Sequence, residues 1–209
     1  NFTPRQPKPN SLVYLQNNDT EKSYWLTYDG ILDDWNKTYF KDTIAKKDLI
    51  TFGSKYNTSF SKVAIADTIN LPKSTFTISI DTTINNNRLI KLCVLPNRQL
   101  NSIEINSNTK KKFKQFSING TEVSTKIDSK FFNDESPRIA TYSVVDNEPL
   151  ELSFSIEDDT EPHIELFEIS HDILQNEQLN VSKRQENMIP KPFVINDAII
   201  TKNTIEFND

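Results

Sequence analysis

Few side chains in this sequence could act in catalysis or hold a metal, and the two histidines come first among them. His163 and His171 are eight residues apart in a stretch that reads as a β-strand. That spacing separates them by about 27 Å in an extended strand, at roughly 3.3 Å per residue. No HExxH or comparable ligand spacing accompanies them, so the pattern predicts ordinary surface or structural histidines and no zinc site.

Carboxylates gather in two short runs, Asp146–Glu148 and Glu157–Glu161. Oxygen ligands from the second run, chiefly Asp158 and Asp159, would suit Ca²⁺ at the rim of a β-domain. The run lacks the spacing of an EF-hand loop, so a solvated turn is the favoured interpretation and a Ca²⁺ site is the open alternative. A pair of acids for glycoside hydrolysis also stays open, because two such residues need not be close in sequence.

Nucleophilic and phosphate-binding chemistry has little support in the sequence. Cys93 lies in the apolar run Leu89–Leu95, which predicts a buried small hydrophobe. The chain has three glycines, far apart, so no glycine-rich phosphate loop can form, and no G-x-S-x-G motif is present. We therefore expect no catalytic, cofactor-binding or metal-binding residue, and we expect that this chain is not itself an enzyme.

Aromatic side chains between residues 11 and 40 are the remaining candidates for a site. Trp25, Tyr28 and Trp35 would form an aromatic surface, able to stack on a sugar or bind a peptide, if they were exposed together. Packing of the same rings inside the protein is the favoured alternative.

Composition limits the kinds of partner and the domain organisation that this chain can have. A net charge of −5 and a pI near 5.2 argue against nucleic acid as the main partner. No apolar run approaches the length of a membrane helix, so no direct membrane insertion is expected. Three prolines among the first nine residues predict a linker over 1–10, which suggests a piece of a longer protein. No convincing boundary follows, so a single domain over 11–209 is expected.

Alternation of apolar and polar residues with a period of two dominates the rest of the chain. It is clearest in Leu150–Glu157, and in Thr75–Ile80 it places Phe76, Ile78 and Ile80 on one face. Asn-Gly at 119–120 predicts a hairpin over 113–123. About ten such segments at regular spacing predict an all-β fold, an antiparallel β-sandwich of jelly-roll or Ig-like type.

One short amphipathic helix is expected near the N-terminus, over Ile31–Phe40. Its apolar positions Ile31, Trp35 and Tyr39 recur every four residues, and Asp29 is placed to cap its N-terminus. We expect this helix to lie across one sheet with Trp35 as its anchor.

Four stretches carry a resemblance to a known family. These are Lys8–Tyr14, Tyr24–Asp29, Leu32–Trp35 and Pro137–Leu150. Together they resemble the C-terminal, β-rich, extracytoplasmic region of membrane-bound M28-family metallopeptidases, which are zinc aminopeptidase-like enzymes, and the Bacteroidetes type in particular.

The resemblance implies a non-catalytic accessory domain that packs on the peptidase domain or helps to position substrate. Zinc is then expected only in the absent peptidase domain, and the partners are the peptidase and membrane domains of the same polypeptide. The location is extracytoplasmic, in the periplasm or at the cell surface, on a membrane protein. The main alternative is a carbohydrate- or ligand-binding β-sandwich module of a cell-surface protein, with a peptide or sugar ligand. A hydrolase with an unrecognised carboxylate site is a third interpretation.

Overall fold

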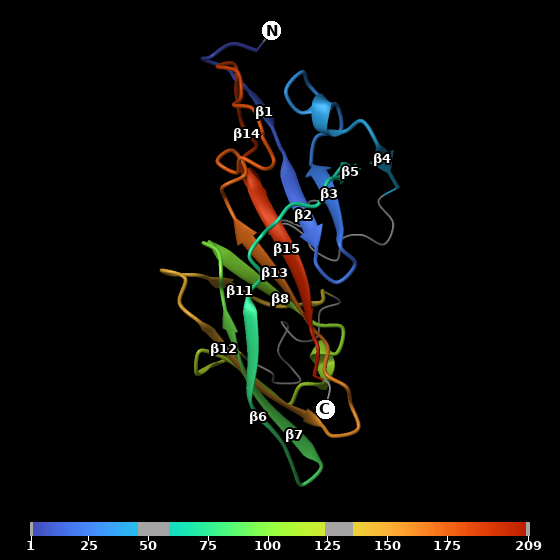
Figure 1. Cartoon of the computed structure of the whole chain (residues 1–209), viewed down its shortest axis with the longest axis vertical. Helices are drawn as coiled ribbons and strands as arrows, with labels where there is room; N and C mark the ends of the chain where they lie inside the picture. The colour runs from blue at the N-terminus through green and yellow to red at the C-terminus, as the bar shows by residue number, and fades with distance from the viewer. Residues whose placement is uncertain (1, 46–58, 124–135, 208–209) are drawn as a thin grey trace. The chain divides into compact units, whose positions relative to one another are not determined.

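A computed structural model describes residues 2–45, 59–123 and 136–207 of the chain. The fold is all-β, and its sheets are mostly antiparallel, as the alternating pattern predicts (Figure 1). The chain divides into two compact units, which are described separately. The first combines Asn1–Asn70 with Ile169–Lys202, and the second combines Leu71–Glu168 with Asn203–Asp209. The expectation of one domain over 11–209 stays a prediction.

The first unit is built on an aromatic hairpin. Strand β2 (Val13–Asn17) pairs antiparallel with β3 (Lys22–Thr27), and β3 pairs with β5 (Lys62–Ala66), beside which lies the short β4 (Thr43–Ile44). On its other side β2 pairs in parallel with the first residues of β15 (Ala198–Ile205).

A separate two-stranded parallel ribbon joins the two segments of the chain that make up the first unit. It consists of β1 (Lys8–Asn10) and β14 (Met188–Pro190), in the register Lys8↔Met188. The last three residues of the predicted linker are therefore a strand in the structure. This ribbon leads directly into β2, which is buried along most of its length.

The second unit is a β-sandwich. One layer has the strand order β10-β9-β12-β7-β6, and the other includes β11, β8 and β13. These strands are β6 (Thr75–Ile84), β7 (Asn87–Leu95), β8 (Ser102–Asn106), β9 (Gln115–Ile118), β10 (Thr121–Glu122), β11 (Arg138–Ser143), β12 (Leu150–Glu157) and β13 (Ile164–Ser170).

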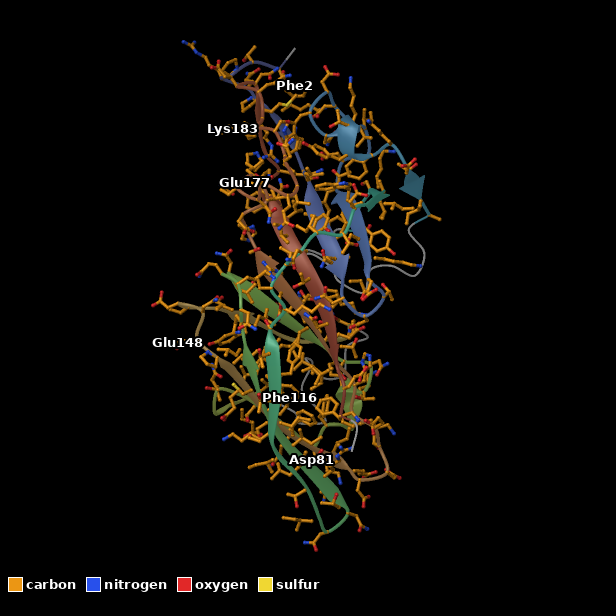
Figure 2. All side chains as sticks on the ribbon, in the orientation of Figure 1. Phe2, Asp81, Phe116, Glu148, Glu177 and Lys183 are labelled. Atoms are coloured by element: carbon orange, nitrogen blue, oxygen red, sulfur yellow. The ribbon has the colours of Figure 1, made fainter. Side chains whose placement is uncertain are left out.

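Four phenylalanines form the centre of the sandwich core. Phe116 and Phe154 stack with ring centroids 5.7 Å apart, and the edge of Phe113 lies against both rings. Phe207 meets Phe154 edge-on. Figure 2 labels Phe116 within this core. Aliphatic side chains of β7, β8 and β12 complete this buried core.

Asparagine takes five of the ten positive-φ positions among the described residues, and glycine takes one. Asn85 and Asn86 both have positive φ, of 50° and 60°, and they join β6 to β7 as a two-residue turn. Asn119 and Gly120 join β9 to β10 in the same way, which confirms the predicted hairpin. Both are the left-handed conformations that a tight β-hairpin requires.

The helix expected over Ile31–Phe40 is wrong. The segment holds one 3₁₀ turn, Lys37–Tyr39, and Ile31 is 85% exposed. The reason is local: the Asp33 carboxylate accepts the backbone N–H groups of Trp35 and Asn36. Side-chain capture of backbone donors competes with helix formation, and a segment this short has little cooperativity to resist it.

Two predictions about individual strands are also wrong. A bulge in β6 between Ile78 and Ile80 reverses the alternation, so Ile80 lies opposite Lys91 and off the core face. Cys93 is half-buried rather than buried, because it alternates with the core residues Leu92 and Val94 on the opposite face of β7. The apolar run Leu89–Leu95 therefore forms a strand with one core face and one outer face.

Candidate functional site

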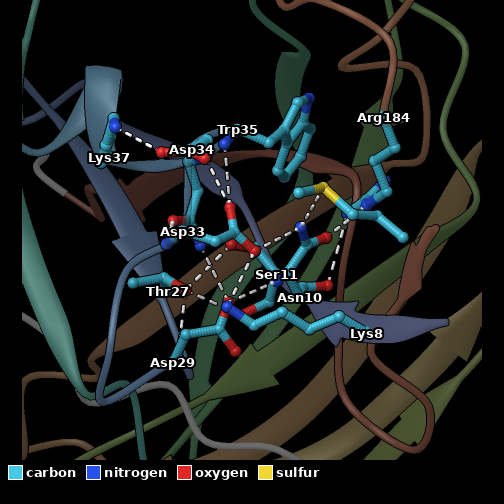
Figure 3. A network of polar contacts seen from close by, with 12 residues as sticks. Lys8, Asn10, Ser11, Thr27, Asp29, Asp33, Asp34, Trp35, Lys37 and Arg184 are labelled. Atoms are coloured by element: carbon cyan, nitrogen blue, oxygen red, sulfur yellow. Dashed lines mark hydrogen bonds and ion pairs between the residues drawn. The ribbon is translucent and has the colours of Figure 1, made fainter. Parts of the chain in front are cut away.

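A group of buried polar side chains in the described part of the first unit surrounds the residues at the end of the proline-rich start (Figure 3). We call this cluster the clasp. Its members come from β1, from the loop after β3 and from the segment around β14. They are Lys8, Asn10, Ser11, Asp29, Asp33, Trp35, Asn36, Arg184 and Asp197.

Asn10 lies at the centre of the clasp and is completely buried. Its amide group donates to the Asp33 carboxylate at 2.9 Å, and its side-chain oxygen accepts from Nε of Arg184. Its backbone carbonyl accepts from Lys191 at 2.8 Å and from Asn196 at 2.9 Å. Three separate segments of the chain therefore converge on one asparagine.

Arg184 binds Asp197 through two parallel hydrogen bonds of 2.6 Å. The Arg184 Cζ atom also lies over the Trp35 ring, 4.1 Å from its centroid. A planar, forked guanidinium can make both contacts at once, which a lysine ammonium cannot. The Trp35 indole N–H donates to the carbonyl of Ser182 at 2.7 Å, so the ring is fixed at its edge as well as its face.

Two carboxylates complete the clasp. Asp29 accepts from the Ser11 amide at 2.8 Å and from the Asn36 side chain at 2.9 Å, and it forms an ion pair with Lys191 at 3.3 Å. Asp33 forms an ion pair with Lys8 at 3.3 Å.

The environment of Asp33 favours its ionised form. Burial raises the pKa of this carboxyl, but the hydrogen bond from Asn10, the backbone donors and the charge of Lys8 outweigh it and hold the pKa below its ordinary value. This carboxylate therefore acts as a fixed acceptor, and a proton-transfer role would need a pKa moved in the other direction.

The aromatic residues singled out from the sequence are divided by the structure. Trp25 is half-buried and contacts Tyr39 at 4.9 Å, and Tyr39 meets Trp35 at 6.3 Å. Trp35 itself is 5% exposed. Tyr28 is 4% exposed and stacks on Phe60 at 4.3 Å instead. Tyr39 thus links the two tryptophans, and Tyr28 belongs to a different ring pair.

The remaining candidates are not members of the clasp. Asp158 and Asp159 are exposed in the turn after β12. His163 lies 4.0 Å from Glu165, and His171 contacts the Asn196 carbonyl at 3.0 Å. Within the described ranges no three His, Cys, Asp or Glu side chains come close enough together to hold a metal ion. In the same ranges no helix is long and apolar enough to cross a bilayer.

Reasoning from sequence missed Asn10, Arg184 and Asp197. Arg184 and Asp197 lie more than 170 residues after Asn10, and nothing local marks them as partners. Asp33 and Asn36 could have been found from the sequence. An Asp three residues before an Asn, shortly after Gly30, is typical of a turn in which side chains bond to the backbone.

Comparison with known proteins adds no assignment. No family model matches the chain, and a search of curated proteins found no match.

Proposed function

We propose that this chain is a non-catalytic accessory β-sandwich of a membrane-attached, M28-like zinc metallopeptidase, located outside the cytoplasm. In this role it packs on the peptidase domain or helps to position substrate. Zinc and the catalytic groups belong to the peptidase domain, which lies outside this sequence.

The proposal rests on the position of the residues that resemble the family. Three of the four stretches that resemble the family are Lys8–Tyr14, Tyr24–Asp29 and Leu32–Trp35, and these stretches supply most of the clasp. Residues that resemble one family and that also bind one another form a coherent structural element. Such an element fixes the direction in which the chain enters the first unit, as a domain attached to an enzyme requires.

The chemistry of the clasp favours a structural role over a catalytic one. Asp29, Asp33 and Asp197 each accept hydrogen bonds or ion pairs from within the chain. A buried polar network with its groups satisfied in this way makes the local structure rigid and specific. We therefore assign the clasp to holding the arm formed by residues 8–12.

The gene provides the first test. The reading frame upstream of Asn1 should encode a peptidase domain with a two-zinc ligand set, followed by membrane helices. A gene without both features would contradict the proposal.

The full-length protein provides the second test. Deleting 11–209 should leave the zinc content of the peptidase domain unchanged and reduce its activity toward peptide substrates. Activity that does not change for any substrate length would argue against an accessory role.

A hollow in the first unit favours a second candidate, a carbohydrate- or ligand-binding module. It has a volume of about 380 Å³, and Lys22, Tyr24, Ile44 and Ile65 are among its lining residues. That volume lies in the range of small-molecule sites. Titration of linear β-1,4- and α-1,4-linked oligosaccharides, followed by NMR, would test it. Shifts confined to β3 and β5, and lost in Tyr24→Ala, would support this candidate, and a spectrum unchanged by every sugar would reject it.

A further inference from the structure

Strand β6 forms one border of the five-stranded sheet in the second unit. Among the described strands its pairing partner is β7 (Figure 1). Its ten residues are TFTISIDTTI, with no Lys, Arg or Pro. Lys and Pro are among the residues with which proteins usually prevent edge strands from pairing with other chains. β6 contains two other such features, the bulge and the core-facing Asp81, but the bulge precedes Ile80 and Asp81 is bound by Arg88. Among the described strands, the part of this border after the bulge has no second partner and can pair with a further strand.

The apolar side chains near the end of β6 are exposed. Ile80 is 40% exposed and Ile84 is 61% exposed. After the bulge, Ile80 lies opposite Lys91, Thr82 opposite Leu89 and Ile84 opposite Asn87. Successive residues of a strand point to opposite faces, so Ile80, Thr82 and Ile84 share the outer face of the sheet and Asp81 and Thr83 share the core face.

This five-residue edge is complementary to itself. In an antiparallel pair of two copies centred on Thr82, Thr82 lies opposite its own equivalent. Ile80 of each copy then lies opposite Ile84 of the other, on the same outer face, so two aliphatic pairs form. On the core face Asp81 of each copy lies opposite Thr83 of the other. A two-fold interface of this kind needs one patch that matches itself.

The charges at the edge are arranged to permit this contact. Asp81, labelled in Figure 2, accepts two hydrogen bonds from Arg88, at 2.8 and 2.7 Å. The Arg88 hydrogen bonds hold the pKa of Asp81 below its ordinary value, so the pair stays ionised. Within one copy Thr83 lies opposite Arg88. In the two-fold pair the Asp81 of the second copy lies opposite Thr83, and each Asp81 keeps the Arg88 of its own chain as its partner, so the contact adds no unpaired charge.

We propose that the edge Ile80–Ile84 of β6 binds a second copy of this chain, as an antiparallel two-fold strand pair centred on Thr82. Backbone hydrogen bonds between the strands supply the contact, and the Ile80–Ile84 pairs set its register. A contact of this length is smaller than a standard interface, so the dimer is concentration-dependent.

Disulfide cross-linking tests the register. In a Cys93→Ser background, Thr82→Cys should form a covalent dimer under mild oxidation, because directly opposed Cα atoms lie within disulfide range. Thr77→Cys is the matched control, since it too is an exposed threonine on the outer face of β6. In the proposed pair the two copies of residue 77 lie ten positions apart, about 33 Å, and should not cross-link. Equal cross-linking of both variants would overturn the proposal.

Sedimentation of the chain without added cysteines is the second measurement. The unmodified chain should show a mass that rises with concentration. Ile80→Lys should remain monomeric over the same range. Val145→Lys, which also replaces an exposed apolar residue by lysine but lies in a turn, should behave like the unmodified chain. A monomer at every concentration, or a dimer unaffected by Ile80→Lys, would contradict the proposal.

Discussion

The clasp of the first unit and the core of the second unit are stabilised by different physics. The clasp buries amides, carboxylates and a guanidinium that bind one another. The sandwich core buries stacked phenylalanines and aliphatic side chains. Apolar packing tolerates substitutions that preserve side-chain volume. A buried polar network, in contrast, loses much stability when one of its members is removed. We infer that the clasp sets the course of the chain and that the sandwich core supplies bulk stability.

The largest effect is expected in the apolar core. Phe154→Ala should lower the unfolding free energy of the second unit by about 4 kcal/mol, because it leaves a cavity beside Phe116 and Phe113. Amide hydrogen exchange of β7 and β12 measures this. Ser153→Ala, its half-exposed neighbour, should change the value by less than about 0.5 kcal/mol. A loss no greater than that of the control would show that the core is not as described.

Breaking the ion pair of the clasp should have the next largest effect. Arg184→Met leaves Asp197 without its partner and should cost about 3 kcal/mol. Both tryptophans of the chain belong to the first unit, so tryptophan fluorescence during urea unfolding reports on this unit.

The double variant Arg184→Met with Asp197→Asn sharpens the comparison. It should recover part of the loss, because no unpaired charge remains, while the hydrogen bond to Asn10 and the contact with Trp35 stay lost. A double variant less stable than Arg184→Met would contradict the picture of a mutually satisfied pair.

Glu104 gives the second unit a pH dependence of its own. Burial raises the pKa of this carboxyl to about 7, although Arg138 opposes the shift, from an ordinary value of 4.5. The folded unit therefore keeps a proton that the unfolded chain loses, and its stability should fall as pH rises from 4.5 through about 7. Glu104→Gln should remove that decline, as followed by amide exchange of β8. A decline that persists in Glu104→Gln would assign it to another group.

Asp33 should give the first unit a smaller dependence of opposite sign. Its pKa lies below the ordinary value of 3.8, so its contribution is present above that pH and is lost as pH falls through the lowered pKa. Acid unfolding followed by tryptophan fluorescence should therefore begin at higher pH in Asp33→Asn than in Asp34→Asn, an exposed neighbour. The same acid midpoint in both variants would contradict the role of Asp33.

The sequence predicts local structure well and distant contacts poorly. Strict alternation in Leu150–Glu157 gave an uninterrupted ladder with β7, and Asn119 with Gly120 formed the expected turn. The helix failed because Asp33 captures backbone donors that a 3.6-residue period cannot reveal. The contacts of Asn10 with Arg184 have no sequence signal, since they depend on tertiary folding alone.

Hydrogen exchange of the N-terminal arm tests most directly whether the clasp holds it. The amides of Lys8, Ser11 and Leu12 donate to Asn187, Asp29 and Asn196 at 2.8, 2.8 and 2.9 Å. In the unmodified chain they should exchange as slowly as those of β2. Arg184→Met should accelerate exchange in the arm and leave β7 and β12 protected. Exchange that is unchanged in the arm, or accelerated equally in the arm and the sandwich, would contradict the account.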